Sequence, residues 1–125
     1  MVELPVYRLQ ARCCMRISSL PEPPYYMVSF TSQRTEIDDG YGEMGYAMTE
    51  LASRQPGYLG FESARGADGF GILISYWKDE ASIRNWKSVV DHLEAQRRGR
   101  QDWYSRYEIR VALVQRAYGF DIEKQ

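Results

Sequence analysis

The chain has 125 residues, a length that fits one domain and leaves little room for a second. A formal net charge of −1 gives no indication of a general affinity for nucleic acid or anionic membranes, and no apolar run is long enough to span a bilayer. The only two cysteines, Cys13 and Cys14, are neighbours in the sequence. They provide no disulfide framework and fit a cytoplasmic, reducing environment.

Aromatic residues make up 14% of the chain, and ten of its residues are tyrosines. Tyrosine suits a surface that is partly buried and partly in contact with water. The excess therefore fits a protein that dimerises or that encloses a flat organic ligand. Packing of an ordinary core would explain it as well.

Residues 1–24 show no hydrophobic period, and we interpret them as an irregular N-terminal arm outside the core. Pro21, Pro23 and Pro24 make the end of this arm stiff and extended. The next segment, Tyr25–Ser32, is rich in aromatic and β-branched residues and is apolar on both faces. This pattern predicts a central strand that is covered on both sides.

A helix is predicted next, and it should end before Gln55, because the proline and glycine that follow stop a helix. The residues of its apolar stripe are Met44, Ala47, Met48, Leu51 and Ala52. Three glycines crowd its first turns, and this has two explanations. The simpler is that the regular helix begins only near Glu43, and the other is that a ligand or a partner backbone comes close there. A weakly alternating strand over Tyr58–Ala64 follows.

The stretch Gly69–Trp86 is predicted to begin as a strand and to become a helix almost at once. A glycine-rich hairpin precedes Phe70–Trp77, which alternates as a buried strand. Asp79 is a good N-cap for a helix that runs from about Glu80 to Arg98. Its apolar positions recur one turn apart, at Ile83, Trp86, Val90 and Leu93.

After a short turn that holds Trp103 and Tyr104, a final strand is predicted over Tyr107–Val114, with one strongly apolar face. The main domain is then expected to cover residues 25–120, and residues 121–125 to form a tail. The predicted order is strand, helix, strand, strand, helix, strand. This order is the ferredoxin-like βαββαβ arrangement of the α+β class, a four-stranded antiparallel sheet with two helices on one face.

The other face of such a sheet would be bare, yet these strands carry apolar residues on both faces. A second copy of the chain, related by two-fold symmetry, is the simplest cover. We therefore predict a homodimer in which the two sheets face each other.

Two segments, QPGYLGFESARGADGFGILISYWKDEASIRNWK and HLEAQRRGRQDWYSRYEIRV, resemble the antibiotic biosynthesis monooxygenase-like (ABM) family. The resemblance runs from about Tyr25 to Phe120. It implies the dimeric α+β barrel fold, with a pocket between the sheet and the helices of each protomer. The activities it implies are oxygenation of polycyclic phenols without metal or flavin, oxidation of quinols, and degradation of heme.

The heme-degrading branch of the family carries an asparagine on the first strand and a tryptophan on the second helix, with a histidine ten residues later. Trp86 matches the tryptophan, but Gln96 stands ten residues after it, and His92 only six residues after it. The first strand offers Ser29 and Thr31 instead of asparagine. A heme-binding or heme-degrading relative is therefore the third alternative.

The remaining chemistry needs only a base and an organic pocket, because a single histidine cannot form a multi-histidine metal site, and no metal or cofactor is expected. His92 is the candidate catalytic base. Trp77, Trp86 and Tyr25 are candidates to line the substrate pocket, and Arg34 to stabilise a substrate anion. Each also has a purely structural interpretation: the two tryptophans as core residues, and His92 as a surface histidine paired with a carboxylate.

Two functions therefore stand. The first is a cofactor-independent monooxygenase that acts on a small aromatic phenol or quinol. The second is a non-catalytic dimeric barrel that binds a small molecule or supports another protein. A sizeable pocket reached by both His92 and Trp86 would favour the enzyme, whereas a filled interior with His92 in solvent would favour the second function.

Overall fold

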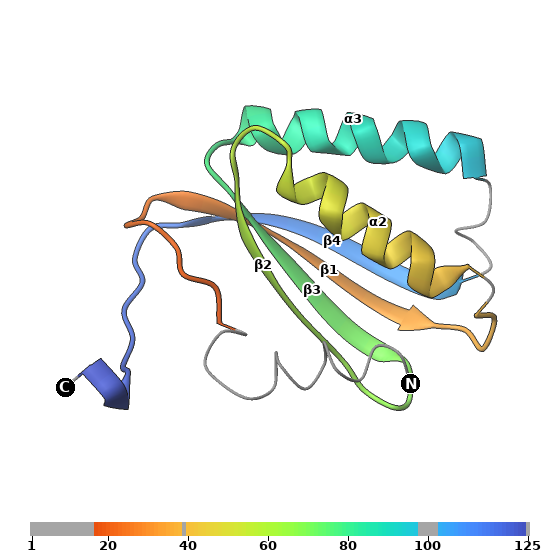
Figure 1. Ribbon diagram of the computed structural model, residues 1–125, viewed down its shortest axis with the longest axis horizontal. Helices are drawn as coiled ribbons and strands as arrows, with labels where there is room; N and C mark the ends of the chain where they lie inside the picture. The colour runs from red at the N-terminus through yellow and green to blue at the C-terminus, as the bar shows by residue number, and fades with distance from the viewer. Residues whose placement is uncertain (1–16, 39, 98–102, 125) are drawn as a thin grey trace.

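The computed structural model describes residues 17–38, 40–97 and 103–124, and this part of the chain forms one antiparallel sheet and two α-helices (Figure 1). The strands are β1 (Tyr25–Arg34), β2 (Tyr58–Arg65), β3 (Phe70–Trp77) and β4 (Tyr104–Val114). The helices are α2 (Tyr41–Ser53) and α3 (Glu80–Arg97), and a short 3₁₀ helix covers Ile122–Lys124. The order of these elements confirms the predicted ferredoxin-like βαββαβ fold.

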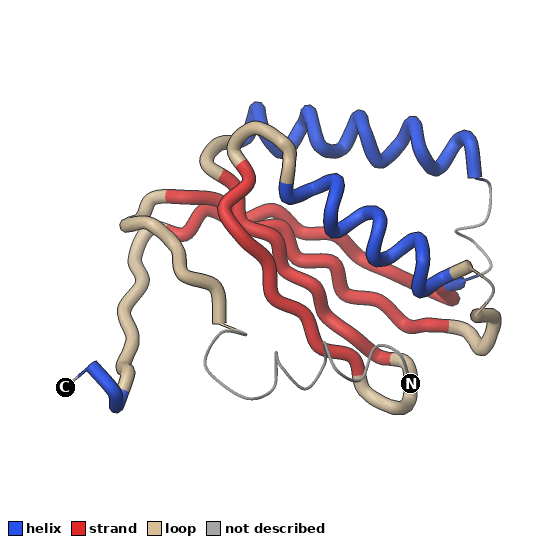
Figure 2. Tube along the Cα trace, viewed as in Figure 1, coloured by secondary structure: helices blue, strands red, loops and turns tan. Residues whose placement is uncertain are grey.

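Both helices lie on the same side of the sheet, as expected (Figure 2). The strand order across the sheet is β2-β3-β1-β4, so that β1 and β3 are central. Val28 of β1 is opposite Ser75 of β3 and Val111 of β4. Phe61 of β2 is opposite Ser75 on its other side. Since residues opposite one another point to the same face, these positions form one row across all four strands.

Some element boundaries differ from the predicted ones. β1 continues to Arg34 instead of ending at Ser32, because Arg34 pairs with Tyr104 across an irregularity in the ladder. Tyr104, expected in a turn, is therefore the first residue of β4. Helix α2 begins at Tyr41, earlier than expected, because Gly40 adopts a left-handed conformation with φ of 77° and closes the preceding turn.

The N-terminus of α3 confirms Asp79 as the cap. Its Oδ1 atom accepts hydrogen bonds from the backbone N–H of Ser82 at 2.8 Å and from the Ser82 hydroxyl at 2.7 Å. These bonds hold the pKa of Asp79 below its usual value. The first turn of α3 packs against Gly57, where φ is 84° and a Cβ atom would lie 2.0 Å from the Ser82 hydroxyl oxygen.

The face of the sheet opposite the helices carries exposed apolar side chains in the described part of the chain. Phe70 and Ile72 of β3 are 48% and 41% exposed. Ile109 and Val111 of the edge strand β4 lie on the other face of the sheet, the one that carries the helices. They are also half exposed, because the helices cover this face only in part. The described chain therefore leaves apolar surface uncovered, as the homodimer prediction requires, but the second copy itself stays a prediction.

Residues 17–24 form neither helix nor strand and lie against β2. The backbone N–H of Ser18 donates to Glu62 at 2.9 Å, and the Ser18 hydroxyl donates to the carbonyl of Phe61 at 2.8 Å. Cys13 and Cys14, like the rest of residues 1–16, lie outside the described residues. At the other end, Tyr118 and Phe120 are exposed. The proposed domain boundaries stay predictions.

Candidate functional site

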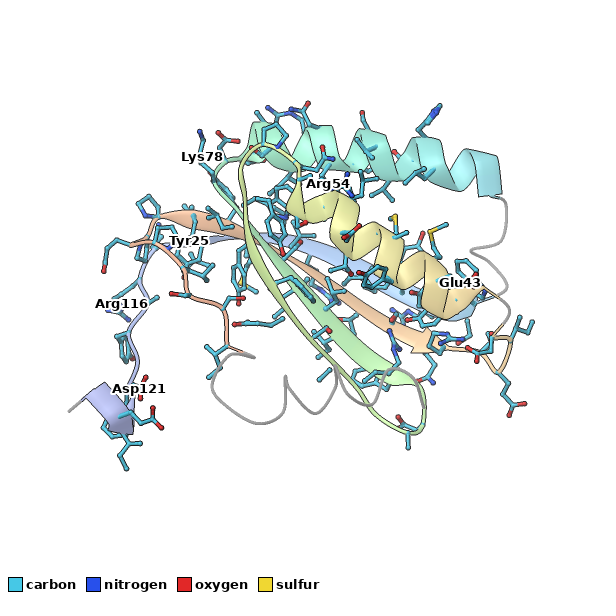
Figure 3. The ribbon with its side chains drawn as sticks, in the orientation of Figure 1. Tyr25, Glu43, Arg54, Lys78, Arg116 and Asp121 are labelled. Atoms are coloured by element: carbon cyan, nitrogen blue, oxygen red, sulfur yellow. The ribbon has the colours of Figure 1, made fainter. Side chains whose placement is uncertain are left out.

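A cavity of about 620 Å³ lies between the sheet and the two helices, and we call it the interlayer cavity. Its volume falls in the range of small-molecule sites. Side chains of α2, α3 and all four strands line it, and they project into this layer from both sides (Figure 3). Most of the lining is apolar, with Met44 and Met48 from α2 and Phe30, Leu73 and Ile109 from the sheet.

One wall of the interlayer cavity is aromatic. Trp86 of α3 lines the cavity and stacks on Trp77 of β3, with ring centroids 6.0 Å apart. Trp77 is completely buried, and its indole N–H donates to the Ser75 hydroxyl at 2.9 Å. Tyr58 meets Trp77 edge to face at 5.6 Å, and burial raises the pKa of Tyr58. This wall offers flat surfaces to an aromatic ring.

Two tyrosines introduce polar groups into the cavity. Tyr41, at the beginning of α2, and Tyr104, at the beginning of β4, both line it. The Tyr104 hydroxyl donates to the Tyr41 hydroxyl across 3.5 Å. Burial, and then the hydrogen bond to Tyr41, raise the pKa of Tyr104 above its usual value.

Arg34 lies behind Tyr41. Its guanidinium carbon is 3.4 Å from the centroid of the Tyr41 ring, a close cation–π contact. The Arg34 Nε atom donates to the backbone carbonyl of Trp103 at 3.1 Å, and one terminal nitrogen donates to the carbonyl of Ile37 at 2.8 Å. The side chain of Arg34 is only 12% exposed. A buried charge of this kind needs such partners, and here they also fix its position.

Arg65 of β2 also lines the cavity. It donates to the hydroxyl of the buried Ser32 at 2.7 Å and to the backbone carbonyl of Gly69. Its guanidinium lies across Gly71, where a Cβ atom would come within 2.7 Å of it. A side chain at position 71 would therefore displace the Arg65 guanidinium from this place.

The structure does not bring the five predicted site residues together. Trp86 lines the interlayer cavity, and Trp77 supports it from behind. Tyr25 points to the opposite face, where its ring meets Tyr76 edge to face at 5.8 Å (Figure 3). Arg34 reaches the cavity only through Tyr41, and the side chain of His92 is exposed on α3. His92 does not line the cavity, but its sequence neighbours Asp91 and Leu93 do.

Sequence reasoning missed Tyr41, Tyr104 and Arg65. Tyr41 stands in the glycine-rich stretch that was explained by a late helix start, and Tyr104 was assigned to a turn. Arg65 ends a strand that alternates only weakly. The available signal was one tyrosine just before a predicted helix and another just before a predicted strand, but nothing local indicates that these two segments meet.

The described part of the chain contains neither a metal-binding cluster nor a membrane-spanning helix. No three histidine, cysteine, aspartate or glutamate side chains there gather in a group that could hold a metal ion. No helix of that part has the length and apolar character needed to cross a membrane.

Comparison with known proteins identifies the family. Residues 38–98 match the family model for antibiotic biosynthesis monooxygenase. The chain is also 49% identical over 100 residues to YqjZ of Bacillus subtilis (strain 168), an uncharacterized protein, and the match covers 80% of this chain and 88% of YqjZ. The chain belongs to the antibiotic biosynthesis monooxygenase family. The expected resemblance is thus confirmed.

Solved structures show the same fold for this family member. PA3566 from Pseudomonas aeruginosa superimposes with a TM-score of 0.58 and 12% identity, covering 78% of this chain and 99% of that one. SnoaB from Streptomyces nogalater, a cofactor-independent oxygenase, gives a TM-score of 0.59 and 15% identity, with 76% and 97% covered. At sequence identities this low, the similarity shows a shared fold and nothing more.

Proposed function

We propose that this family member is a cofactor-independent monooxygenase that oxidises a small aromatic phenol or quinol in the interlayer cavity. The observation that carries the proposal is the cavity itself, about 620 Å³ of mostly apolar space with an aromatic wall at Trp86. Membership of the antibiotic biosynthesis monooxygenase family supports it. So does the shared fold of SnoaB, which is described as a cofactor-independent oxygenase.

The chemistry requires no metal or flavin. Loss of the phenol proton gives a phenolate, which passes one electron to O₂. The resulting radical pair combines at a ring carbon to form a peroxide. This peroxide loses water and leaves a quinone, so that one phenol and one O₂ give one quinone and one H₂O. The protein binds the ring, keeps bulk water out and stabilises the anion.

Trp86 and the apolar lining are suited to hold the ring, while Trp77 keeps Trp86 in place. His92 remains the candidate base, because it is the only histidine in the chain and is adjacent in sequence to Asp91, which lines the cavity. The Asp91 carboxylate forms an ion pair with Lys87, with 2.8 Å between Oδ2 and Nζ. Arg34 remains a candidate to favour the anion through its positive charge.

The proposed assembly is a homodimer. Its support is the exposed apolar surface on the helix-free face of the sheet, where Phe70 and Ile72 lie. Large apolar side chains exposed next to one another are available for contact with a partner. A second copy would cover this surface by two-fold symmetry.

A non-catalytic binding protein is the second candidate. The exposure of His92, outside the cavity lining, favours it, since a general base must reach the substrate. The fold and the cavity would serve a carrier of aromatic molecules equally well.

Oxygen uptake distinguishes the two candidates. Purified protein is screened with a panel of phenols and quinols, and wild type is compared with His92→Ala and with the exposed control Tyr46→Phe. The monooxygenase proposal predicts oxygen uptake and stoichiometric quinone in wild type and Tyr46→Phe, and a loss of at least about tenfold in His92→Ala. Ligand binding without oxygen uptake would support the carrier. A Soret shift with added hemin would instead favour the third alternative, a heme-binding relative.

A further inference from the structure

We infer, resting on the proposed function for the location of the ligand, that the hydroxyls of Tyr41 and Tyr104 form a paired anchor for the oxygen of a bound phenolate or quinone. Arg34 is the positioning residue of this anchor. The ligand is thereby oriented, with its oxygen at the tyrosine pair and its ring in the apolar remainder of the interlayer cavity.

The first argument for the anchor is the distance between the two hydroxyl oxygens. They are 3.5 Å apart, longer than the usual 2.7–2.8 Å of a hydrogen bond between hydroxyl groups. The direct contact is therefore weak. A ligand oxygen placed beside the pair can lie at ordinary hydrogen-bond distance from both oxygens at once, which replaces one long bond with two of normal length.

The Tyr104 hydroxyl is the donor of the pair. A tyrosine hydroxyl is protonated at neutral pH, and burial raises the pKa of Tyr104 further above its usual value. Its present acceptor is the Tyr41 hydroxyl at 3.5 Å, and a negatively charged or carbonyl oxygen is a better acceptor. A phenolate or quinone oxygen is such an acceptor, while a hydrocarbon is not.

Two cations make an anion favourable at the same place. The positive charges of Arg65 and Arg34 both act on the Tyr104 hydroxyl and oppose the effect of its burial. The Arg65 side chain lines the cavity, and Arg34 lies directly behind the Tyr41 ring. An anionic oxygen bound at the pair would feel both charges in a partly buried site, where electrostatic attraction is stronger than in water. The Asp38 carboxylate, 3.4 Å from a terminal nitrogen of Arg34, offsets part of the Arg34 charge.

Arg34 connects the two segments that supply the hydroxyls. Its guanidinium stacks on the ring of Tyr41, and its Nε atom holds the carbonyl of Trp103, the residue directly before Tyr104. The backbone N–H of Thr35 donates to the same carbonyl at 2.8 Å. The two tyrosines are 63 residues apart in the chain, so their spacing depends on this junction.

The test uses para-nitrophenol, whose phenolate is yellow and whose binding needs no oxygen chemistry. Nitrobenzene, which lacks the hydroxyl oxygen, is the matched ligand. Wild type should bind the phenolate about tenfold more tightly than nitrobenzene, and the pKa of the bound phenol should fall by about one unit. Tyr41→Phe and Tyr104→Phe should each lose this preference, while their affinity for nitrobenzene stays within about twofold of wild type. The retained nitrobenzene affinity shows that the variants still have the cavity.

Two further variants separate positioning from general damage. Tyr46→Phe, an exposed tyrosine of α2, should behave as wild type. Arg34→Gln should lose the preference for phenolate, and Arg34→Lys should restore part of it, because lysine keeps a cation over the Tyr41 ring. Equal phenolate preference in wild type and in both tyrosine variants would overturn the anchor, as would the absence of any preference in wild type. Tyrosine-dependent binding without oxygen uptake would support the anchor. It would count only against the proposed monooxygenase activity.

Discussion

Trp77 and Trp86 are stacked, with ring centroids 6.0 Å apart and ring planes inclined by 25°. Trp77 is completely buried at the end of β3, whereas Trp86 on α3 lines the interlayer cavity. The strand therefore holds the helix residue in place. Trp77 therefore links the stability of the fold to the shape of the cavity wall, because it supports that wall without lining the cavity.

Trp77→Ala should lower the free energy of unfolding by about 3–5 kcal/mol, because it removes the largest fully buried side chain of the described chain. Urea unfolding measures this change. Tyr118→Ala is the control, since Tyr118 is 90% exposed and its removal should cost less than about 0.5 kcal/mol. A cost below about 1 kcal/mol for Trp77→Ala would show that the stack is not a structural support.

Two glycine substitutions should have opposite effects on stability. Gly57→Ala should destabilise the fold by more than about 1 kcal/mol, because φ is 84° and the new Cβ atom would collide with Ser82. Gly42→Ala, inside α2 with nothing within 4 Å of the new atom, should stabilise it by up to about 1 kcal/mol. Thermal unfolding of the two variants checks the signs, and a stable Gly57→Ala protein would contradict the close packing of α3.

Asp79→Ala should destabilise the protein at neutral pH, because it removes the acceptor that caps α3 through Ser82. The pKa of Asp79 is lower in the folded than in the unfolded chain. Its ionised form therefore stabilises the fold above the unfolded-state pKa of about 4, and this contribution is lost as pH falls through the folded-state pKa.

The difference in melting temperature between wild type and Asp79→Ala should accordingly shrink on acidification. Asp79→Asn is the matched control, since an amide oxygen still caps the helix but carries no charge. A difference that is the same at acidic and at neutral pH would mean that the carboxylate does not act through its charge.

The helix-free face should mediate dimerisation. Light scattering of wild type should give twice the chain mass of 14.6 kDa, and Phe70→Lys or Ile72→Lys should shift the protein towards the monomer. Tyr46→Lys, on the helix side, is the control. A wild-type monomer with a normal melting transition would refute the predicted homodimer.

Much of the fold follows from local signals. The alternation of Phe70–Trp77, the cap at Asp79 and the apolar stripe around Trp86 each depend on neighbours in the sequence, and each lies where it was predicted. Helical geometry also explains why His92 is outside the cavity lining. Nine residues of helix rotate the His92 side chain about 180° from that of Ile83, which lines the cavity.

The tyrosine pair could not be predicted in this way. Tyr41 and Tyr104 meet only because β1 and β4 pair through Arg34, a contact set by the register of the whole sheet. Arg34 was chosen as an anion-stabilising residue because of its charge. Its actual contacts, with the Tyr41 ring and the Trp103 carbonyl, depend on the turn between β1 and α2.

The central claim is that the interlayer cavity is the place of oxidation, and filling the cavity tests it most directly. Met48 lines the cavity, so Met48→Trp should occupy much of its space while keeping an apolar surface. Oxygen uptake is measured with the best phenol of the panel for wild type, Met48→Trp and the exposed control Tyr46→Phe. We predict uptake in wild type and Tyr46→Phe and a loss of more than about tenfold in a folded Met48→Trp protein. Undiminished uptake in the filled variant, or no uptake by wild type with any phenol or quinol, would contradict the claim.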